Sequence, residues 1–388
     1  MPQPRRVAVI GAGMLGVCLT ARLAWAGAEV TLLERAEPGQ AATRSSFAWL
    51  NSNDKAPRAY HDLNHAGMRA WAALSEALGG APWYQPSGNI EWAVTGHGRA
   101  ELAARVRRLT DWGYPAHLIG AAEAADLDPS LRVPGDGAGI AWFPEEGYLL
   151  TERLVSDLTR RAVQHGASVL TGERGHAIGF TIRGGAVRAV RTAAGREVAA
   201  DVVVCCAGRW VPELAALAGA EGRLPLVPWA EPGAEAPGLV VLAGPVTPPG
   251  PARVVHAPGV HLRPHPGGLV HLEAPDAAAD LHTPDADLRR WAGELLARAR
   301  RVVRGLDDAE ITGYRVCVRP MPADGQSIAG WLPGPAGLYV AVTHSGVTLG
   351  AHLARLITAE LLTGATVPDL APYRPARFSS APAAPERS

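Results

Sequence analysis

The strongest constraint on the fold lies in the first thirty-four residues. An apolar segment at Val7–Ile10 leads directly into G-A-G-M-L-G, in which Gly11, Gly13 and Gly16 have the G-x-G-x-x-G spacing. A second apolar segment, V-T-L-L, ends on Glu34. Strand, glycines, helix, second strand and acid therefore follow one another in the order of a dinucleotide-binding βαβ unit.

Each residue of this fingerprint has a physical role. Gly11 permits the tight turn, Gly13 lets the backbone approach a pyrophosphate, and Gly16 lets the helix pack closely on the strand. The free amides and the dipole at the start of the helix favour negative charge. Glu34 lies where a carboxylate accepts hydrogen bonds from a ribose diol. The sequence therefore predicts a bound dinucleotide.

Length, charge and cysteine content restrict the class of protein to which this chain can belong. The 388 residues are enough for two or three domains. A formal net charge of zero gives no field that attracts nucleic acid or an anionic membrane. The four cysteines form no disulfide pattern, which favours a reducing cytoplasm. We find no apolar run long enough for a membrane span, and the glycines within the N-terminal apolar run argue against a signal peptide.

The order of the expected elements indicates an interleaved architecture. Hydrophobic periodicity predicts helices at 57–78, 100–112, 154–167 and 287–303, and a buried strand passing into a long helix at 340–350. Prolines and glycines break 225–268 into short segments typical of an antiparallel sheet. Nucleotide-binding segments thus occur at the start, middle and end of the chain, with other segments inserted between them.

Two C-terminal motifs carry a resemblance to a known family. C-V-R-P-M-P-A-D-G-Q-S-I-A-G at 317–330 and G-L-Y-V-A-V-T-H-S-G-V-T-L-G at 337–350 resemble the D-amino-acid oxidase, glycine oxidase and sarcosine oxidase superfamily. The N-terminal fingerprint, S-S-F-A-W-L-N at 45–51 and D-V-V-V-C-C-A-G-R-W at 201–210 also fit it. The resemblance covers about residues 5–365, and 81–145 and 215–310 match only loosely.

This resemblance implies an α/β fold with FAD as the cofactor. A Rossmann-like FAD-binding domain of the GR2 type would be interleaved with an α+β substrate domain built on an antiparallel sheet. We expect the FAD-binding domain at 1–80, 146–215 and 314–375, the substrate domain at 81–145 and 216–313, and a disordered tail at 376–388.

The family's chemistry implies an enzyme that oxidises the C–N bond of an amino acid or secondary amine. A hydride passes from the carbon bearing the amine to flavin N5, and the resulting imine hydrolyses. The expected partners are a small amine and O2 or another electron acceptor, with no nucleic acid and no membrane. Alternatives are a non-catalytic structural flavoprotein, and a flavin monooxygenase or NAD(P)-linked reductase, although no second G-x-G-x-x-G is present.

The resemblance also implies roles for individual residues. Arg319 would bind a substrate carboxylate in bidentate fashion, the alternative being a surface arginine before a proline. His344 is either catalytic or a structural hydrogen-bonding group, and Trp49 lies near the isoalloxazine or in the core. The expected catalytic residues are Arg319, His344 and Trp49. The expected cofactor-binding residues are Gly11, Gly13, Gly16, Glu34, Arg35, Ser45, Ser46, Gly208, Cys317, Gly346, Val347 and Thr348.

Cys317 has two interpretations. In the sarcosine-oxidase branch a cysteine seven residues before an aspartate is bonded covalently to the flavin, and Asp324 supplies that spacing here. In the glycine-oxidase branch this position usually holds glycine, and a cysteine would be a small buried replacement. The single lysine, Lys55, leaves the oxygen-activating lysine of sarcosine oxidases absent or moved, so a dehydrogenase also fits.

Two further patterns are interpreted as non-catalytic. His61 and His65 have the i, i+4 spacing of a zinc helix, but no third ligand is identifiable, so we expect no metal site. Glu145 and Glu146, in P-E-E-G-Y, are expected to form a loop rather than a paired-carboxylate site.

Overall fold

The computed structural model describes residues 6–135, 137–220 and 224–378. It contains two compact units, each assembled from separate stretches of the chain. The first unit comprises Met1–Arg44, Thr151–Val227 and Arg319–Ser388, and the second comprises Ser45–Leu150 and Pro228–Val318. Each unit has its own hydrophobic core.

The first unit is built on a six-stranded sheet in the order β19-β20-β13-β1-β2-β9. Its strands are parallel except for β19, which pairs antiparallel with β20. The strands of this sheet are β1 (Arg6–Ile10), β2 (Glu29–Glu34), β9 (Ser168–Thr171), β13 (Val202–Cys205), β19 (Ile328–Trp331) and β20 (Leu338–Val342). The remaining elements are α1 (Met14–Trp25), α2 (Ala42–Ser45), α6 (Thr151–Gln164), α7 (Val211–Ala216), α9 (Gly346–Thr363), β10 (Ala177–Arg183), β11 (Ala186–Thr192), β12 (Glu197–Ala199) and the short 3-10 turns η1 (Gly172–Arg174), η2 (Gly208–Trp210), η3 (Pro368–Tyr373) and η4 (Pro375–Phe378).

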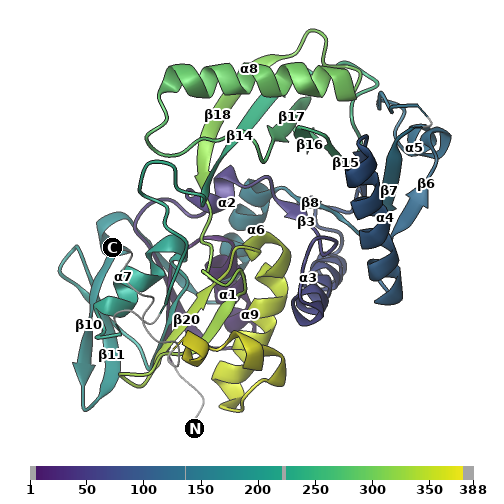
Figure 1. The fold of residues 1–388 in the computed structure, drawn as a ribbon. Coiled ribbons are helices and arrows are strands. Elements are labelled where there is room, and N and C mark those ends of the chain that lie inside the picture. The colour runs from purple at the N-terminus through teal and green to yellow at the C-terminus, as the bar shows by residue number, and fades with distance from the viewer. Residues whose placement is uncertain (1–5, 136, 221–223, 379–388) are drawn as a thin grey trace, which may run out of the picture. The chain divides into compact units, whose positions relative to one another are not determined.

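Both faces of this parallel sheet are covered, which explains its nearly continuous apolar strands. On one side α1 packs against α6 and α9 (Figure 1). On the other side, Ile10, Val203 and Val340 share a core with residues of α7 and of the three-stranded sheet β10-β11-β12. A strand buried on both faces cannot show the polar alternation of a half-exposed strand.

The second unit is built on an eight-stranded sheet in the order β18-β14-β17-β16-β15-β5-β7-β6. Its strands are β5 (Asn89–Ala93), β6 (His117–Ile119), β7 (Gly139–Phe143), β14 (Pro237–Gly244), β15 (Val254–Ala257), β16 (Val260–His265), β17 (Leu269–Glu273) and β18 (Glu310–Val318). The other elements are α3 (Arg58–Ala77), α4 (Gly96–Asp111), α5 (Ala121–Leu127), α8 (Asp285–Val302) and a small sheet of β3 (Trp49–Leu50), β8 (Gly147–Leu149) and β4 (Tyr84–Gln85).

One face of the large sheet forms the core of the second unit. Alternate residues such as Val241, Leu262 and Leu272 form the core with one side of α8, which lies across these strands in Figure 1. α8 has acidic residues in its first turn and arginines in its last, as its macrodipole favours. The opposite face carries buried apolar residues, such as Phe143 and Val254, together with the polar side chains described below.

The structure differs from the sequence expectations in the large sheet, in the boundaries of the units and at the C-terminal tail. β5 and β15 pair in parallel, so the sheet of the second unit is not wholly antiparallel. Residues 45–80 belong to the second unit instead of the first, because β3 pairs with β8 and Trp71 of α3 packs edge-on against Trp83. Residues 146–150, which include β8, and residues 314–318 also belong to the second unit, whereas 216–227 belong to the first. The expected tail at 376–388 is folded into η4 up to Phe378, and its remainder lies outside the described residues.

Candidate active site

The expected cofactor-binding segments of the first unit meet at one edge of its sheet. β1, β2, β13 and β20 are parallel, so their carboxyl ends lie at the same edge. These ends lead into Gly11, Glu34, Gly208 and Gly346. Ligands of open α/β sheets bind at this edge, outside the carboxyl ends of the strands.

The glycine-rich turn has the packing that its sequence predicts. Gly11 has φ +99°, and a Cβ there would lie 2.7 Å from the Cys206 carbonyl oxygen. A Cβ on Gly16 would lie 1.8 Å from the Gly11 carbonyl oxygen, so only glycine lets α1 begin so close to β1. At Gly13 a Cβ would meet Thr43 Oγ1 alone, at 3.4 Å. The backbone is therefore open to a ligand at Gly13, which fits the pyrophosphate of a dinucleotide.

The side chains of Glu34 and Arg35 both contact other residues of the first unit. Glu34 Oε2 accepts a hydrogen bond from the Ala12 amide at 2.8 Å, and Oε1 accepts one from the Ala36 amide at 2.9 Å. A carboxylate has about four acceptor positions, so Glu34 retains capacity for a ribose diol. The Arg35 guanidinium lies 3.8 Å from the centre of the Trp210 ring. The role of Arg35 in binding the cofactor stays a prediction.

The long C-terminal helix supplies a second positive helix end. α9 begins at Gly346, and its first turn holds Val347 and the buried Thr348. Thr343 Oγ1 accepts hydrogen bonds from the Ser345 amide at 3.1 Å and from the Ser327 hydroxyl at 2.8 Å, which fixes the chain just before the helix. No acidic residue lies in the first turn of α9, so its dipole is not offset there. His344 is exposed.

Cys317 and Arg319 lie at the end of β18. Cys317 is buried and pairs with Gly238 of β14. Arg319 is half-buried and follows the last residue of the strand. The Asp324 carboxylate, which completes the spacing of a covalent flavin site, forms an ion pair with Arg377 at 2.7 Å. A covalent flavin link and a carboxylate-binding role for Arg319 both stay predictions.

In the second unit, a hydrogen bond and a ring contact fix the orientation of the Trp49 side chain. Its Nε1 donates to Glu146 Oε2 at 2.9 Å. Its ring lies 4.0 Å from the His256 ring, centre to centre. The chain before it is turned sharply, because Ala48 has φ +61° and its amide donates to Ser46 Oγ at 3.0 Å. Ser45 is buried and Ser46 half-buried. Trp49 is only half-buried, so it is not a core residue.

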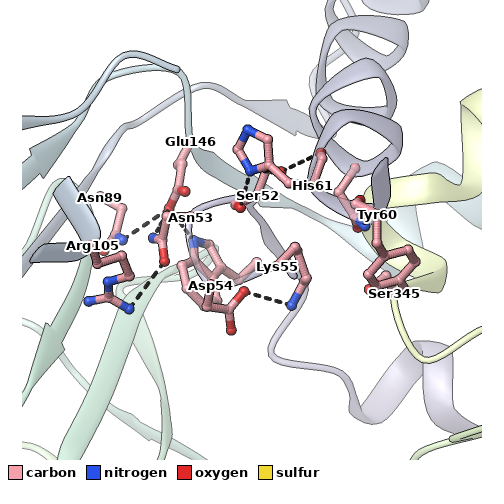
Figure 2. A network of polar contacts seen from close by, with 12 residues as sticks. Ser52, Asn53, Asp54, Lys55, Tyr60, His61, Asn89, Arg105, Glu146 and Ser345 are labelled. Atoms are coloured by element: carbon pink, nitrogen blue, oxygen red, sulfur yellow. Dashed lines mark hydrogen bonds and ion pairs between the residues drawn. The ribbon is translucent and has the colours of Figure 1, made fainter. Parts of the chain in front are cut away.

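Glu146 is the centre of a buried polar network that the sequence did not reveal. The expected turn after β7 is present, but its two acids diverge: Glu145 binds the His65 ring at 2.7 Å, whereas Glu146 is fully buried. Glu146 accepts hydrogen bonds from Trp49, Asn53, Asn89 and Tyr114, at 2.9, 3.1, 3.0 and 2.7 Å in that order. Figure 2 shows Asn53 and Asn89 on the carboxylate. Burial raises the pKa of Glu146 to about 8.

The polar face of the eight-stranded sheet adds a group of basic side chains. Facing positions of neighbouring strands bring together His256 with His261, Arg263 with His271, and His261 with Glu273. Burial lowers the pKa of His256 and of His271 well below the usual value, so both rings are neutral at pH 7. A buried face of neutral imidazoles offers hydrogen bonding without fixed charge.

Arg263 is the buried cation of this face. Its guanidinium donates to the carbonyls of Phe47 and Pro264 and to His271 Nδ1. It also lies 4.8 Å from the centre of the Tyr148 ring. Burial lowers its pKa to about 10, which leaves it charged at pH 7. These bonds tie β16 to the segment that carries Trp49.

A weak sequence signal for this face existed. In V-H-L-R-P-H at 260–265 and V-H-L-E at 270–273, apolar residues alternate with histidine, arginine and glutamate. Such period-two alternation normally marks a solvent-facing strand. Here Arg263 and His271 are buried and the other polar positions are half-buried. This burial follows from the pairing of strands and is not visible in the local pattern.

The histidine and the lysine singled out in the sequence contact residues outside the network around Glu146. His61 Nδ1 lies 2.8 Å from the Ser52 carbonyl oxygen, and burial lowers its pKa (Figure 2). Lys55 forms an ion pair with Asp54 at 2.7 Å (Figure 2). Among the described residues, no group of three or more His, Cys, Asp or Glu is placed to hold a metal ion. Within that same part of the chain, no helix is long and apolar enough to cross a membrane.

Comparison with known proteins identifies the family. The sequence model of the FAD-dependent oxidoreductase family DAO matches residues 6–360. This chain belongs to that family. It is therefore an FAD-dependent oxidoreductase, and the open backbone at Gly13 and the two helix N-termini at the sheet edge fit the cofactor. The predicted α/β class, with a Rossmann-like FAD domain and a substrate domain, is confirmed.

Proteins similar to this chain differ in the functions that their names state. The chain is 28% identical to the glycine oxidase of Pseudomonas aeruginosa, over 96% of this chain and 98% of that protein. It is 29% identical to the bifunctional tRNA 5-methylaminomethyl-2-thiouridine biosynthesis protein of Thiobacillus denitrificans, over 94% of this chain and 57% of that protein. The structure of L-proline dehydrogenase from P. horikoshii superimposes with a TM-score of 0.82 at 19% identity, covering 98% of this chain and 99% of that one.

Proposed function

We propose that this chain oxidises the C–N bond of a small amino acid or secondary amine to an imine, which water then hydrolyses. The observation that carries the proposal is the family match over residues 6–360. The relatives support it, because glycine oxidase acts on an amino acid by its name and matches 96% of this chain. FAD, when bound, accepts the hydride released from the carbon bearing the amine.

In this proposal the first unit holds the cofactor and the charge that develops on it. The α1 N-terminus and Glu34 bind the pyrophosphate and ribose of the dinucleotide. The α9 N-terminus stabilises the negative charge that accompanies hydride transfer, because helix amides and dipole favour an anion there. Arg319 binds the substrate carboxylate, since a guanidinium matches a carboxylate with two parallel hydrogen bonds.

The second unit supplies the substrate side. Trp49 is the residue we assign to the reacting centre, and its fixed orientation restricts how a substrate lies beside it. The neutral histidines of the sheet face form hydrogen bonds with the substrate without adding fixed charge. A small free amine is favoured over a nucleic acid substrate, because the chain has a formal net charge of zero.

Anaerobic flavin reduction tests this function. The purified protein, loaded with FAD, is mixed with glycine, sarcosine, proline and D-amino acids while the flavin absorption is followed. We expect at least one of these amines to bleach the flavin, and subsequent admission of air distinguishes an oxidase from a dehydrogenase. Reduction by dithionite but by no amine in the panel would contradict the proposal and favour a structural flavin.

Arg6 provides a matched control for Arg319. Its guanidinium is exposed and forms an ion pair with Asp201 at 2.8 Å. In Arg6→Gln, the rate of flavin reduction should depend on the amine concentration as it does in the unaltered protein. Arg319→Gln should instead require a far higher concentration of a carboxylate substrate for the same rate. Equal behaviour of the two variants would remove Arg319 from the substrate site.

A further inference from the structure

A buried histidine of the sheet face carries a ring nitrogen with no partner. His256, on β15, is 5% exposed. Its Nδ1 lies 2.8 Å from Asn89 Oδ1, whereas its Nε2 is enclosed and has no hydrogen-bond partner among the described residues. Buried polar atoms are normally paired, and an unpaired one calls for an explanation.

The network around Glu146 determines the tautomer of this ring. Trp49 Nε1–H can only donate, so Glu146 Oε2 acts as an acceptor. Asn89 Nδ2 donates to the same oxygen at 3.0 Å, which turns Asn89 Oδ1 toward His256. Since Asn89 Oδ1 is an acceptor, His256 Nδ1 must carry the proton. Nε2 is then a bare lone pair.

This conclusion holds for either protonation state of Glu146. The other carboxylate oxygen, Oε1, lies 2.7 Å from the Tyr114 hydroxyl. A proton on Glu146 would reside on Oε1 and be donated to that hydroxyl, which leaves Oε2 as an acceptor. The orientation of Asn89 is therefore independent of the charge on Glu146.

The surroundings keep the His256 ring neutral and leave Nε2 as its single free polar atom. Burial, His261 and Arg105 all lower the pKa of His256. The ring has aromatic neighbours, with the centre of the Trp49 ring at 4.0 Å, that of His261 at 4.2 Å and that of Phe47, edge-on, at 6.1 Å. A neutral acceptor enclosed by rings is matched by a ligand that brings an N–H group, because that donor would satisfy the lone pair.

We propose that His256 is a substrate-binding residue whose Nε2 accepts a hydrogen bond from the amine N–H of the substrate. This inference rests on the proposed C–N oxidation and specifies its substrate as a primary or secondary amine. A tertiary amine without an N–H group in its neutral form would leave Nε2 unpaired. Asn89 and Glu146 are positioning residues that set the tautomer.

Rapid mixing under anaerobic conditions provides the test. The dependence of the flavin reduction rate on the concentration of an amine that reduces the unaltered protein gives a Kd and a limiting rate. His256→Phe keeps a ring beside Trp49 but removes the acceptor, and we expect it to raise that Kd about 10- to 100-fold. His256→Gln, which offers an amide oxygen near the place of Nε2, should recover part of the affinity.

Asn89→Leu separates the tautomer from the histidine itself. Leucine has the branched shape of asparagine, although it is larger, and it cannot accept from Nδ1. Both tautomers of His256 therefore become available and the Kd should also rise. Nitrogen-15 NMR of histidine-labelled protein should show an unprotonated Nε2 in the unaltered protein, with the signals assigned by their loss in His256→Phe. His97→Gln, at an exposed histidine of α4, is the matched control and should change neither readout.

The outcomes distinguish this inference from the proposed function. If no amine reduces the flavin of the unaltered protein, the proposed function fails and this inference fails with it. If an amine does reduce the flavin but His256→Phe keeps the original Kd, only the role of His256 is wrong. Should the phenylalanine variant not fold, an original Kd in both His256→Gln and Asn89→Leu leads to the same conclusion. A protonated Nε2 in the unaltered protein would also overturn that role.

Discussion

Glu146 makes the stability of the second unit depend on pH. Burial raises its pKa to about 8 in the folded protein, against 4.5 for an unperturbed glutamate. A raised carboxyl pKa means that the folded state holds its proton more tightly than the unfolded state does. The contribution of Glu146 to the free energy of unfolding is therefore complete below pH 4.5 and is lost as the pH rises to about 8. The free energy of unfolding falls by at most about 1.4 kcal/mol per pH unit over this range.

Urea unfolding at several pH values between 5 and 9 measures this effect. Glu146→Gln reproduces the protonated form, with its carbonyl toward Trp49 and its amide toward Tyr114, and lacks the titration. We expect the free energy of unfolding of the unaltered protein, relative to the variant, to fall between pH 5 and 8. A difference that stays constant over this range would show that Glu146 does not titrate there.

Arg319 gives a residue-scale prediction for the substrate. If its guanidinium binds the substrate carboxylate, Arg319→Lys should raise KM about tenfold or more, because an ammonium cannot make two parallel hydrogen bonds. The limiting rate of flavin reduction should change less. Comparing an amino acid with its amide provides the control, since the neutral amide should be little affected by the substitution.

Two helical glycines provide a prediction at the scale of elements. A Cβ on Gly16 of α1 would lie 1.8 Å from the Gly11 carbonyl oxygen, so Gly16→Ala must push α1 away from β1 and lose about 1–3 kcal/mol of stability together with FAD affinity. Gly293 of α8 is exposed, and a Cβ there meets nothing within 4 Å. Gly293→Ala should instead stabilise by about 0.5–1 kcal/mol. Thermal unfolding with and without added FAD measures both, and equal effects would contradict the packing argument.

The elements themselves were largely predictable, because their signals are local. The fingerprint located β1, α1 and β2, and hydrophobic periodicity located α3, α4, α6 and α8 to within a few residues. The buried network was not predictable in this way. Glu146 is buried by partners 32 to 97 residues away in the chain, and no local pattern records such contacts. The same holds for His256, whose partner Asn89 lies 167 residues away.

At the scale of the whole molecule, the chain passes repeatedly between two cores. Each unit contains segments far apart in sequence, so each core is completed only when distant parts of the chain have been paired. This also explains why the boundaries of the two units could not be predicted correctly from the sequence. Residues 45–80 follow the nucleotide fingerprint directly, yet their partners, among them Tyr148 and Trp83, lie in the second unit.

The connection of FAD to the chain gives the last prediction. Cys317 is buried within β18 and paired with Gly238, and Asp324, which completes the covalent motif, is engaged by Arg377. This is the environment of a small structural residue that replaces glycine, so we expect a dissociable cofactor. Acid precipitation should release the flavin into the supernatant, and Cys317→Gly should leave FAD content unchanged. Flavin fluorescence that stays with the denatured unaltered protein, but is lost in Cys317→Gly, would instead establish a covalent bond at this cysteine.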